Sequence, residues 1–285
     1  MDATDLQRKI DEVGFWWHSI SLAPGYVTPG HKTPAQLDYE LKAMRLPDLS
    51  GKTVIDVGAW DGFFSFESER RGASRVVALD HYVWSLDIPA ARRYWDTCRE
   101  NGRVPQQYHS LPDLWRPHEL PGKRGFDVAR AALGSRVEAR VDDLMQGDPE
   151  RFGQFDVALY LGVLYHLQNP FEGLQRLARL VRELAIIETE AIVVPGYEDV
   201  ALCEFYESNE LNADVSNWWG PTEKAVLGMC RAAGFRRAES LVPPPVAASP
   251  PPPPTSFFGG WRRRPPPRPP SGPPLHYRAF IHAWK

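Results

Sequence analysis

The sequence contains few cysteines and no long apolar run, and these absences exclude several classes of protein. Its 285 residues include three cysteines, Cys98, Cys203 and Cys230, which form neither a CxxC pair nor a Cys/His spacing typical of a metal site. We therefore expect reduced thiols, a cytoplasmic location and no bound metal. No segment reaches the roughly 18 apolar residues of a membrane span, and the acidic start MDATDLQRKIDEVGFWW lacks the layout of a signal peptide. Secreted, membrane and disulfide-scaffold proteins are not indicated.

The chain also has no excess of charge of one sign. Lys and Arg number 33 against 36 Asp and Glu, which gives a formal net charge of -3 and a pI near 6.3. This balance does not indicate a broad basic face, so we do not expect nucleic acid as a partner, although a local patch stays open. A hydrophobic content of 43% is enough for a buried core and excludes disorder of the whole chain.

Proline is abundant, and it is concentrated in one segment. Of the 28 prolines, 15 lie in residues 243–274, together with four arginines. Proline lacks an N–H donor and fixes φ, so this segment should be polyproline-II or disordered rather than helix or central strand. Strand-like sequence resumes at LHYRAFIHAWK, which makes the segment an insertion. Three roles stay open for it: a lid, a docking site for a proline-binding partner, or no role.

Short apolar runs alternate with helical patterns through the rest of the chain. We predict strands at 52–58, 75–80, 136–143, 155–162 and 183–190, one after residue 234, and a last one after the proline-rich insertion. The predicted helices begin after Gly62 and near Asp87, and occupy 125–135, 170–181 and 222–234. Strands separated by helices are typical of a doubly wound α/β fold with a mostly parallel sheet.

Ligands of such sheets bind beyond the carboxyl ends of the strands, so the residues that follow the strands are the site candidates. They are Asp56, Gly58, Trp60 and Gly62, then Asp80, then Asp142 and Asp143, then Gly162, Tyr165 and His166, and finally Glu188. Glycines let a loop turn sharply beside a ligand, and the carboxylate of Asp80 could accept hydrogen bonds from a ribose diol. Alternatively, Asp80 is a helix cap and His166 is a core histidine.

Several of these motifs carry a resemblance to a known family. VIDVGAWDGFFSF, RVVALD and FDVALYLGVLYHLQNP resemble the class I methyltransferases that bind S-adenosylmethionine. GVLYHLQNP, AIIETEAIVVPG and SNWWGPTEKAVLGMCRAAGF resemble, more narrowly, the family of the tRNA wobble-uridine carboxymethyltransferase. The resemblance implies a methyltransferase enzyme with a seven-stranded Rossmann-like sheet and an antiparallel last strand. It also implies S-adenosylmethionine as cofactor and S-adenosylhomocysteine as product.

The resemblance also implies roles for individual residues. Gly58 and Gly62 would line the methionine and ribose of the cofactor, and Asp80 would hold the ribose hydroxyls. Asp142 or Asp143 would face the adenine amino group, Tyr165 would lie beside the sulfonium group, and Arg278 would lie near the pocket. The full set of expected cofactor-binding residues is Asp56, Gly58, Trp60, Gly62, Asp80, Asp142, Asp143, Gly162 and Tyr165.

The sequence departs from the general superfamily in one place and from its carboxymethyl-transferring members in another. Trp60 replaces the second loop glycine of the general superfamily. Where those members have a lysine for the extra carboxylate of their cofactor, this chain aligns Asp38. Like charges repel, so plain S-adenosylmethionine is favoured over its carboxylated form, with Lys32 and Arg278 as cations that could compensate.

Methyl transfer to a hydroxyl requires a base to accept its proton, and His166 and Glu188 are the candidates. The alternative for Glu188 is a structural hydrogen bond inside the pocket. Tyr165 is the third candidate catalytic residue, with packing against the cofactor as its alternative role. Two aromatic segments are expected to bind the acceptor, and with Arg278 their candidate residues are Trp16, Trp17, His18, Tyr206, Asn209, Trp218 and Trp219. The alternative is that these tryptophans only cover the core.

We expect residues 1–50 to form a helical cap over the acceptor pocket and residues 51–285 to form the methyltransferase domain. The predicted function is transfer of a methyl group to an oxygen or nitrogen of a small molecule, such as a specialised metabolite. One alternative is a tRNA wobble-uridine carboxymethyl or methyl transferase. Another is a non-catalytic cofactor-binding protein that displays the proline-rich insertion. The oligomeric state is left open.

Overall fold

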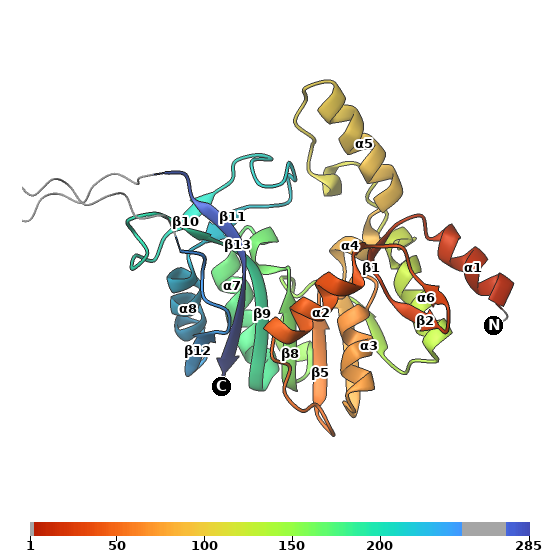
Figure 1. The fold of residues 1–285 in the computed structure, drawn as a ribbon, viewed down its shortest axis with the longest axis horizontal. Coiled ribbons are helices and arrows are strands. Elements are labelled where there is room, and N and C mark those ends of the chain that lie inside the picture. Colours follow the sequence, from red (N-terminus) through yellow and green to blue (C-terminus); the bar gives the residue numbers. More distant parts are fainter. Residues whose placement is uncertain (1–2, 247–271) are drawn as a thin grey trace, which may run out of the picture.

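The computed structural model describes residues 3–246 and 272–285, which are built around a seven-stranded sheet (Figure 1). The order across the sheet is β12-β13-β9-β8-β5-β6-β7. The strands are β5 (Thr53–Val57), β6 (Arg75–Asp80), β7 (Glu138–Val141), β8 (Phe155–Leu161), β9 (Val181–Val193), β12 (Arg237–Ser240) and β13 (Leu275–Trp284). Strands β5 to β9 pair in parallel, whereas β13 is antiparallel to both β9 and β12. The predicted fold, including the antiparallel last strand, is confirmed.

Helices cover both faces of the sheet because the central strands are apolar on both sides. In β5, Val54 belongs to one buried cluster with α2 (Pro34–Ala43), α3 (Phe63–Arg70) and α6 (Arg124–Leu133), and the adjacent Ile55 belongs to a second. The second cluster contains α7 (Pro170–Leu180) and α8 (Glu223–Ala232). This alternation is the period-two pattern of a strand buried on both faces.

The remaining helices lie near the ends of the strands or at the N-terminus. They are α1 (Ala3–Glu12), α4 (Tyr82–Ser85), α5 (Ile88–Glu100), and the 3-10 turns η1 (Tyr108–Ser110), η2 (Pro121–Lys123), η3 (Pro149–Phe152) and η4 (Leu164–His166). Helix α5 begins where Asp87 and Pro89 predict, since the Asp87 side chain accepts a hydrogen bond from Ala90 N. Figure 1 shows α5 reaching away from the sheet.

The first 50 residues are not the helical unit that we expected. Besides α1 and α2 they contain four short strands, β1 (Trp16–His18), β2 (Ser21–Ala23), β3 (Tyr26–Val27) and β4 (Gly30–Lys32), with β1 paired to β4 and β2 to β3. Strands of two or three residues carry no detectable alternation, and these are fixed by distant partners such as Asp61. A further pair, β10 (Cys203–Phe205) and β11 (Trp219–Pro221), was missed for the same reason.

The proline-rich insertion separates β12 from β13. Strand β13 lies between β9 and β12, and its first residue, Leu275, pairs with Val193 at the carboxyl end of β9. The chain therefore re-enters the sheet at the edge where the site candidates lie. Most of the insertion, residues 247–271, lies outside the described residues, so its predicted roles stay predictions.

Two expectations from composition can be compared with the structure. Cys98, Cys203 and Cys230 are all free, as expected. Among the helices of residues 3–246 and 272–285, none is both long enough and apolar enough to cross a membrane.

Candidate active site

The loop from Gly58 to Gly62 connects β5 to α3 at the carboxyl edge of the sheet. Gly58 has a φ of 77°, and a Cβ added there would lie 2.7 Å from Val163 Cγ2, so glycine is needed for the close approach. Gly62 has a φ of 85° and precedes the first turn of α3. Trp60 also has a positive φ, 51°, which is uncommon for a bulky residue.

Neighbouring groups hold Trp60 in this conformation. Its backbone N–H donates to Asp80 Oδ2 at 3.0 Å, and its carbonyl oxygen accepts from Trp84 Nε1 at 2.6 Å. Its ring stacks on Trp17, with 4.7 Å between centroids and 9° between planes, and Trp17 stacks in turn on His31. The departure from the usual loop glycine is thus compensated by contacts with the N-terminal segment.

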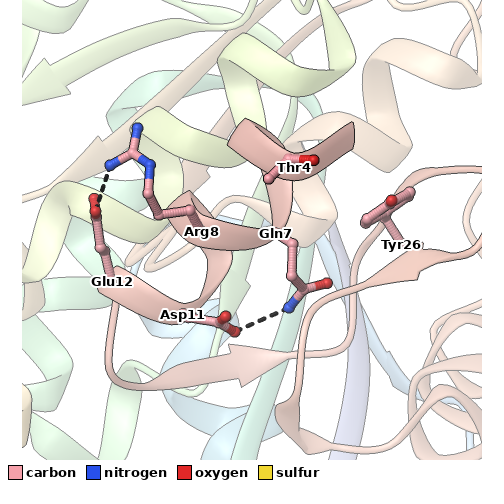
Figure 2. A pocket seen from close by; sticks show the side chains of 6 residues that line it. All are labelled: Thr4, Gln7, Arg8, Asp11, Glu12 and Tyr26. Carbon is pink, nitrogen blue, oxygen red and sulfur yellow. Dashed lines mark hydrogen bonds and ion pairs between the residues drawn. The ribbon is translucent and has the colours of Figure 1, made fainter. Parts of the chain in front are cut away.

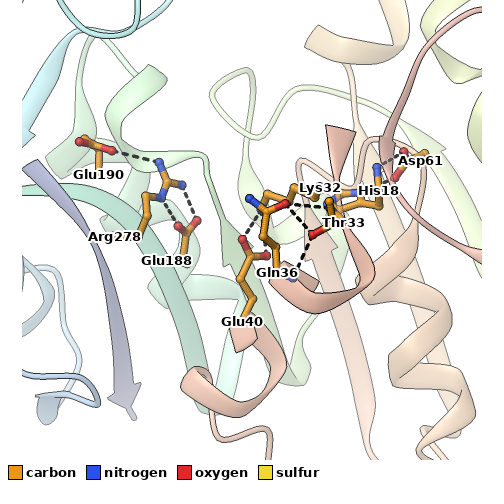
Figure 3. Close-up of polar contacts among 9 residues, drawn as sticks. All are labelled: His18, Lys32, Thr33, Gln36, Glu40, Asp61, Glu188, Glu190 and Arg278. Carbon is orange, nitrogen blue, oxygen red and sulfur yellow. Dashed lines mark hydrogen bonds and ion pairs between the residues drawn. The ribbon is translucent and has the colours of Figure 1, made fainter. Parts of the chain in front are cut away.

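Asp61 attaches that N-terminal segment to the loop. Its Oδ2 accepts hydrogen bonds from the backbone N–H groups of Trp17 and His18, both at 2.9 Å, and its Oδ1 contacts His18 Nδ1 (Figure 3). Of the three acceptor candidates here, Trp16 and His18 are buried, and Trp16 donates to the Ile10 carbonyl. Trp17 is the one of the three that is partly exposed, beside the loop. For Trp16 and His18, burial in the core agrees better with a structural role than with acceptor binding.

Asp80 connects the glycine loop to the end of β6. Its carboxylate accepts hydrogen bonds from Trp60 N and from Val83 N, each at 3.0 Å, so it is both a cap of α4 and a neighbour of the loop. Burial raises the pKa of Asp80 to about 6 despite these bonds. Asp56 is fully enclosed below the loop, where it accepts from Ser65 Oγ at 2.6 Å, and burial raises its pKa to about 7. This placement assigns Asp56 to the support of the loop.

The two carboxylates after β7 have different partners. Asp142 forms ion pairs with Arg151 at 2.6 Å and Arg140 at 3.3 Å. Asp143 accepts from Met145 N at 2.8 Å, and no cation among the described residues forms an ion pair with it. Asp143 therefore has more hydrogen-bonding capacity left for a ligand than Asp142 has.

Arg278 on β13 gathers the acidic side chains of β9. It donates from Nη2 to Glu188 Oε2 at 2.6 Å, from Nε to the other oxygen of Glu188, and from Nη1 to Glu190 at 3.3 Å (Figure 3). Its guanidinium group lies 4.7 Å from the ring centroid of Tyr165. A Cβ at Gly162 would lie within 3.6–3.8 Å of Arg278, Glu188 and Tyr165, so these groups surround the end of β8.

The pairing affects the role expected for Glu188. Burial alone would raise the pKa of Glu188, but Arg278 and Lys32 lower it below its usual value. The carboxylate is therefore ionised and both oxygens are occupied, which favours a structural role over that of a base. Burial raises the pKa of Tyr165, which fits packing against a ligand.

A wider cluster of charge surrounds this pair. His276 lies 3.3 Å from Glu190 and 3.6 Å from Glu204, so three carboxylates share one guanidinium and one imidazole. Lys32 pairs with Glu40 at 2.8 Å (Figure 3). The cluster of Glu188, Glu190, Glu204, Arg278 and His276, here called the acidic cluster, is therefore net negative.

Asp38 is not where we expected a charge beside the cofactor. Its side chain is 63% exposed on α2 and pairs with Lys42, four residues later in the same helix. The local negative charge comes instead from the acidic cluster.

The segment 206–219 lies over η4, at the end of β8. Trp218 N donates to the Tyr165 carbonyl at 2.9 Å, and Trp219 Nε1 donates to the Gln168 carbonyl at 3.3 Å. His166 contacts Ser216 in the same segment. Tyr206 is buried, with its hydroxyl on Glu204, and Asn209 contacts Ser208. Trp218 and Ser216 of this segment therefore lie beside Tyr165 and His166, and the role of the segment in acceptor binding stays a prediction.

A hollow of about 670 Å³ lies away from these strand ends, on α1 (Figure 2). Figure 2 shows that its side chains pair with one another, Arg8 with Glu12 and Gln7 with Asp11. Because these groups are already paired on the exposed side of α1, we assign no function to this hollow.

Comparison with solved structures identifies the fold as the Rossmann-like methyltransferase fold. The N-terminal domain of EvdMO1, crystallised in the presence of S-adenosylhomocysteine and D-fucose, superposes with a TM-score of 0.60. The alignment covers 100% of this chain and 97% of that one at 17% sequence identity, so it speaks for the fold.

Comparison with curated proteins confirms the narrower resemblance. The chain is 26% identical over 194 residues to the tRNA U34 carboxymethyltransferase of Psychrobacter cryohalolentis, covering 68% of this chain and 46% of the relative. It is 42% identical over 161 residues to the enzyme of the same name from Syntrophotalea carbinolica, covering 56% and 38%. The chain thus spans less than half the length of these relatives, and no family model matches it.

Sequence reasoning missed three residues of this site: Asp61, Ser216, and Asp214, whose Oδ1 accepts a hydrogen bond from Ser216 Oγ at 2.8 Å. Asp61 lies within the AWDG loop, but its partners are 43 and 44 residues away. Ser216 meets His166 across 50 residues. The sequence offers one signal, which is that Ser216 begins the SNWWGP motif used for the resemblance.

Proposed function

We propose that the protein is an S-adenosylmethionine-dependent methyltransferase that acts on an oxygen or nitrogen of a small molecule. The observation that carries the proposal is the junction of the glycine loop with Asp80 at the carboxyl edge of a Rossmann-like methyltransferase sheet. In such sheets a nucleoside ligand binds beyond the carboxyl ends of the strands, and a carboxylate accepts hydrogen bonds from its ribose hydroxyls.

The residues that would hold the cofactor are those at the strand ends that keep hydrogen-bonding capacity. Each oxygen of Asp80 accepts one backbone hydrogen bond and keeps a second lone pair, whereas Glu188 is held by the Arg278 guanidinium. Gly58 and Gly62 would let the loop turn beside the methionine, since both have a positive φ. Asp80 would accept from the ribose hydroxyls, and Asp143 rather than Asp142 would accept from the adenine amino group. Tyr165 would pack beside the sulfonium. When bound, the cofactor supplies an electrophilic methyl group, and the protein contributes mainly the alignment of the acceptor with it.

The charge of the acidic cluster favours the plain cofactor. S-adenosylmethionine carries a positive sulfonium, which a net negative surrounding attracts, whereas the extra carboxylate of the carboxylated form would be repelled. Arg278 is one cation that could hold the extra carboxylate, but it already pairs with Glu188 and Glu190. Lys32 is paired with Glu40.

A labelled-transfer experiment tests the acceptor class. The full chain is incubated with methyl-labelled S-adenosylmethionine and either a deproteinised low-molecular-weight cell extract or purified tRNA. We expect label in the small-molecule fraction, and a chain with Asp80→Ala serves as the control that abolishes it. Label in tRNA, with none in the small molecules, would overturn the proposed acceptor.

The second candidate is a tRNA wobble-uridine carboxymethyl or methyl transferase. The observation in its favour is the 42% identity over 161 residues to a protein of that name. It requires tRNA binding that weakens steeply with salt, because phosphate contacts release counterions. A gel-shift series with tRNA from 50 to 200 mM salt separates the two, and we expect no salt-dependent complex for the small-molecule enzyme.

The context of the proposed enzyme follows from the same features. Free thiols fit a cytoplasmic enzyme, and a specialised metabolite is the acceptor that we propose. The remaining alternative is a protein that binds the cofactor and displays the proline-rich insertion to a partner. Deletion of residues 243–274 tests it: loss of a binding partner, with turnover unchanged, would favour this alternative.

A further inference from the structure

His166 at the end of β8 is held by two groups of one residue, Ser216. Its Nδ1 lies 3.0 Å from the backbone carbonyl oxygen of Ser216 and 3.0 Å from the Ser216 hydroxyl. A carbonyl oxygen only accepts hydrogen bonds, so Nδ1 must carry a proton to bond to it. In the neutral imidazole this leaves Nε2 with a lone pair, and no hydrogen-bond partner of Nε2 lies among the residues that the structure describes.

Asp214 extends this contact into a chain of three side chains. Since Nδ1–H is shared with the Ser216 hydroxyl oxygen, the hydroxyl hydrogen is free to point elsewhere, and Ser216 Oγ lies 2.8 Å from Asp214 Oδ1. The same carboxylate oxygen accepts from Ser216 N at 2.9 Å. The order of donation is therefore His166 to Ser216 to Asp214.

The loop that carries this chain is fixed onto η4. Ser216 and Asn217 are buried, and Asn217 Nδ2 donates to the Leu211 carbonyl at 2.9 Å. Trp218 N donates to the Tyr165 carbonyl at 2.9 Å, beside His166 itself. Trp95 of α5 also donates to the Ala213 carbonyl at 2.7 Å. The geometry at His166 is therefore set before any ligand binds.

We propose that Asp214 and Ser216 are positioning residues that hold His166 as the Nδ1–H tautomer, so that Nε2 accepts the acceptor's proton during methyl transfer. This rests on the proposed function. An acceptor oxygen or nitrogen forms the new bond to the methyl carbon as the sulfur–methyl bond breaks and its electron pair stays on sulfur. The proton of that oxygen or nitrogen goes to Nε2, and the imidazolium later releases it to solvent. Asp214 stabilises the imidazolium through the Ser216 hydroxyl.

The charges that face His166 agree with this role. Burial lowers the pKa of His166, so the ring is neutral and able to act as a base at pH 7. Asp214 and Glu188 oppose that shift, and Arg278 adds to it. Asp214 also faces Tyr82 and Tyr108, which are neutral because burial raises the pKa of each.

Nuclear magnetic resonance of the full chain with ¹⁵N-labelled histidine tests the tautomer without an acceptor. The His166 signals are assigned with His166→Gln. We expect the Nδ1–H form in the unsubstituted protein, and a pKa of His166 lowered by about one unit in Asp214→Asn, since an opposite charge is removed. Ser216→Ala should lower the pKa in the same direction and mix the tautomers. The matched control is Asp199→Asn, an exposed carboxylate on another loop, which should change neither.

Native mass spectrometry of the same samples measures binding of S-adenosylmethionine. This measurement distinguishes failure of the inference about His166 from failure of the proposed function. All variants should bind the cofactor as the unsubstituted protein does. An Nε2–H tautomer, or a His166 pKa unchanged in both Asp214→Asn and Ser216→Ala, would overturn the inference while cofactor binding stands. Absence of cofactor binding in the unsubstituted protein would overturn the proposed function, and the role of His166 in transfer with it.

Turnover gives the second readout. With the acceptor fraction from the labelled-transfer experiment, His166→Ala should lower kcat by roughly 10²-fold or more at an unchanged affinity for the cofactor. Asp214→Asn should lower kcat less and shift the pH–rate profile to lower pH. A kcat unchanged in His166→Ala would remove His166 as the base.

Discussion

Arg278 and Glu188 join the last strand to the centre of the site, with 2.6 Å between Nη2 and Oε2. Arg278 belongs to β13, which begins only after the proline-rich insertion, whereas Glu188 belongs to β9 in the middle of the sheet. Arg278 therefore completes the site at the carboxyl edge of the sheet, although the proline-rich insertion separates it in sequence from the other site residues. Glu188 is buried, so the energy of the pair depends on both partners being present.

Replacing Glu188 by Gln should reduce the free energy of unfolding by about 1–3 kcal/mol at pH 7. Loss of one partner of a buried pair costs more than this, but the Arg278 side chain is 36% exposed and water can solvate part of the uncompensated charge. Urea unfolding measures the change. The control is Glu183→Gln, which breaks a solvent-exposed pair with Lys52 and should reduce stability much less. Equal losses in the two variants would contradict the structural role of Glu188.

Asp56 gives a pH dependence of stability with a defined sign. Its pKa is about 7 in the folded protein and about 4 in the unfolded chain, so between these values the folded state binds more protons. Stability from this group is therefore present at low pH and is lost as pH rises through 7. The unsubstituted protein should therefore lose unfolding free energy between pH 5 and pH 8, and Asp56→Asn should make that loss smaller by about 1–3 kcal/mol.

The measurement is the difference in urea unfolding free energy between pH 5 and pH 8. Asp199→Asn, at an exposed position, is the control and should leave that difference as it is in the unsubstituted protein. If Asp56→Asn left it unchanged as well, the carboxyl group would be ionised in the folded state, against the burial described above.

Asp80→Asn should weaken binding of S-adenosylmethionine by about 10–100-fold, because a charged acceptor of ribose hydrogen bonds is lost. Since the pKa of Asp80 is about 6, affinity in the unsubstituted protein should also rise between pH 5 and pH 7 as the carboxylate ionises. Isothermal titration calorimetry measures both. Asp143→Asn should weaken binding about tenfold and Asp142→Asn little, since Arg151 occupies Asp142. The reverse order for that pair would show that the adenine assignment is wrong.

Asp61→Asn should loosen the N-terminal segment from the glycine loop. The carboxylate accepts two backbone hydrogen bonds and contacts His18, so its loss should cost about 2–3 kcal/mol of unfolding free energy. Limited proteolysis should then cleave within residues 1–50 faster than in the unsubstituted protein. Asp127→Asn, on the exposed face of α6 beside Lys123, is the control. Unchanged proteolysis would mean that the stacking of Trp17 on Trp60 suffices.

The sequence predicted the parts of the fold that local patterns determine. The apolar runs at 53–57, 75–80 and 155–161 are strands buried on both faces, and the helix at 170–180 has one apolar side. Asp80, Gly58 and Gly62 lie together because the chain order of a parallel sheet puts its loops at one edge. That topology can be inferred from alternation alone.

Other features depended on contacts between distant residues. The strands at 16–18 and 30–32 are too short for alternation to indicate them, and the chain from His166 to Asp214 spans 48 residues of sequence. A structural hydrogen bond was an alternative for Glu188, but its partner Arg278 was not predicted. Side-chain partners of this kind follow from the folded packing, which a local pattern does not contain.

Native mass spectrometry of the full chain with equal amounts of S-adenosylmethionine and its carboxylated analogue tests the central claim most directly. The two ligands differ by one carboxyl group and are resolved by mass. The acidic cluster and Asp80 predict retention of plain S-adenosylmethionine, and loss of it in Asp80→Ala. Retention of the carboxylated form would contradict the electrostatic argument and support the tRNA-modifying alternative, and retention of neither would contradict the proposed enzyme.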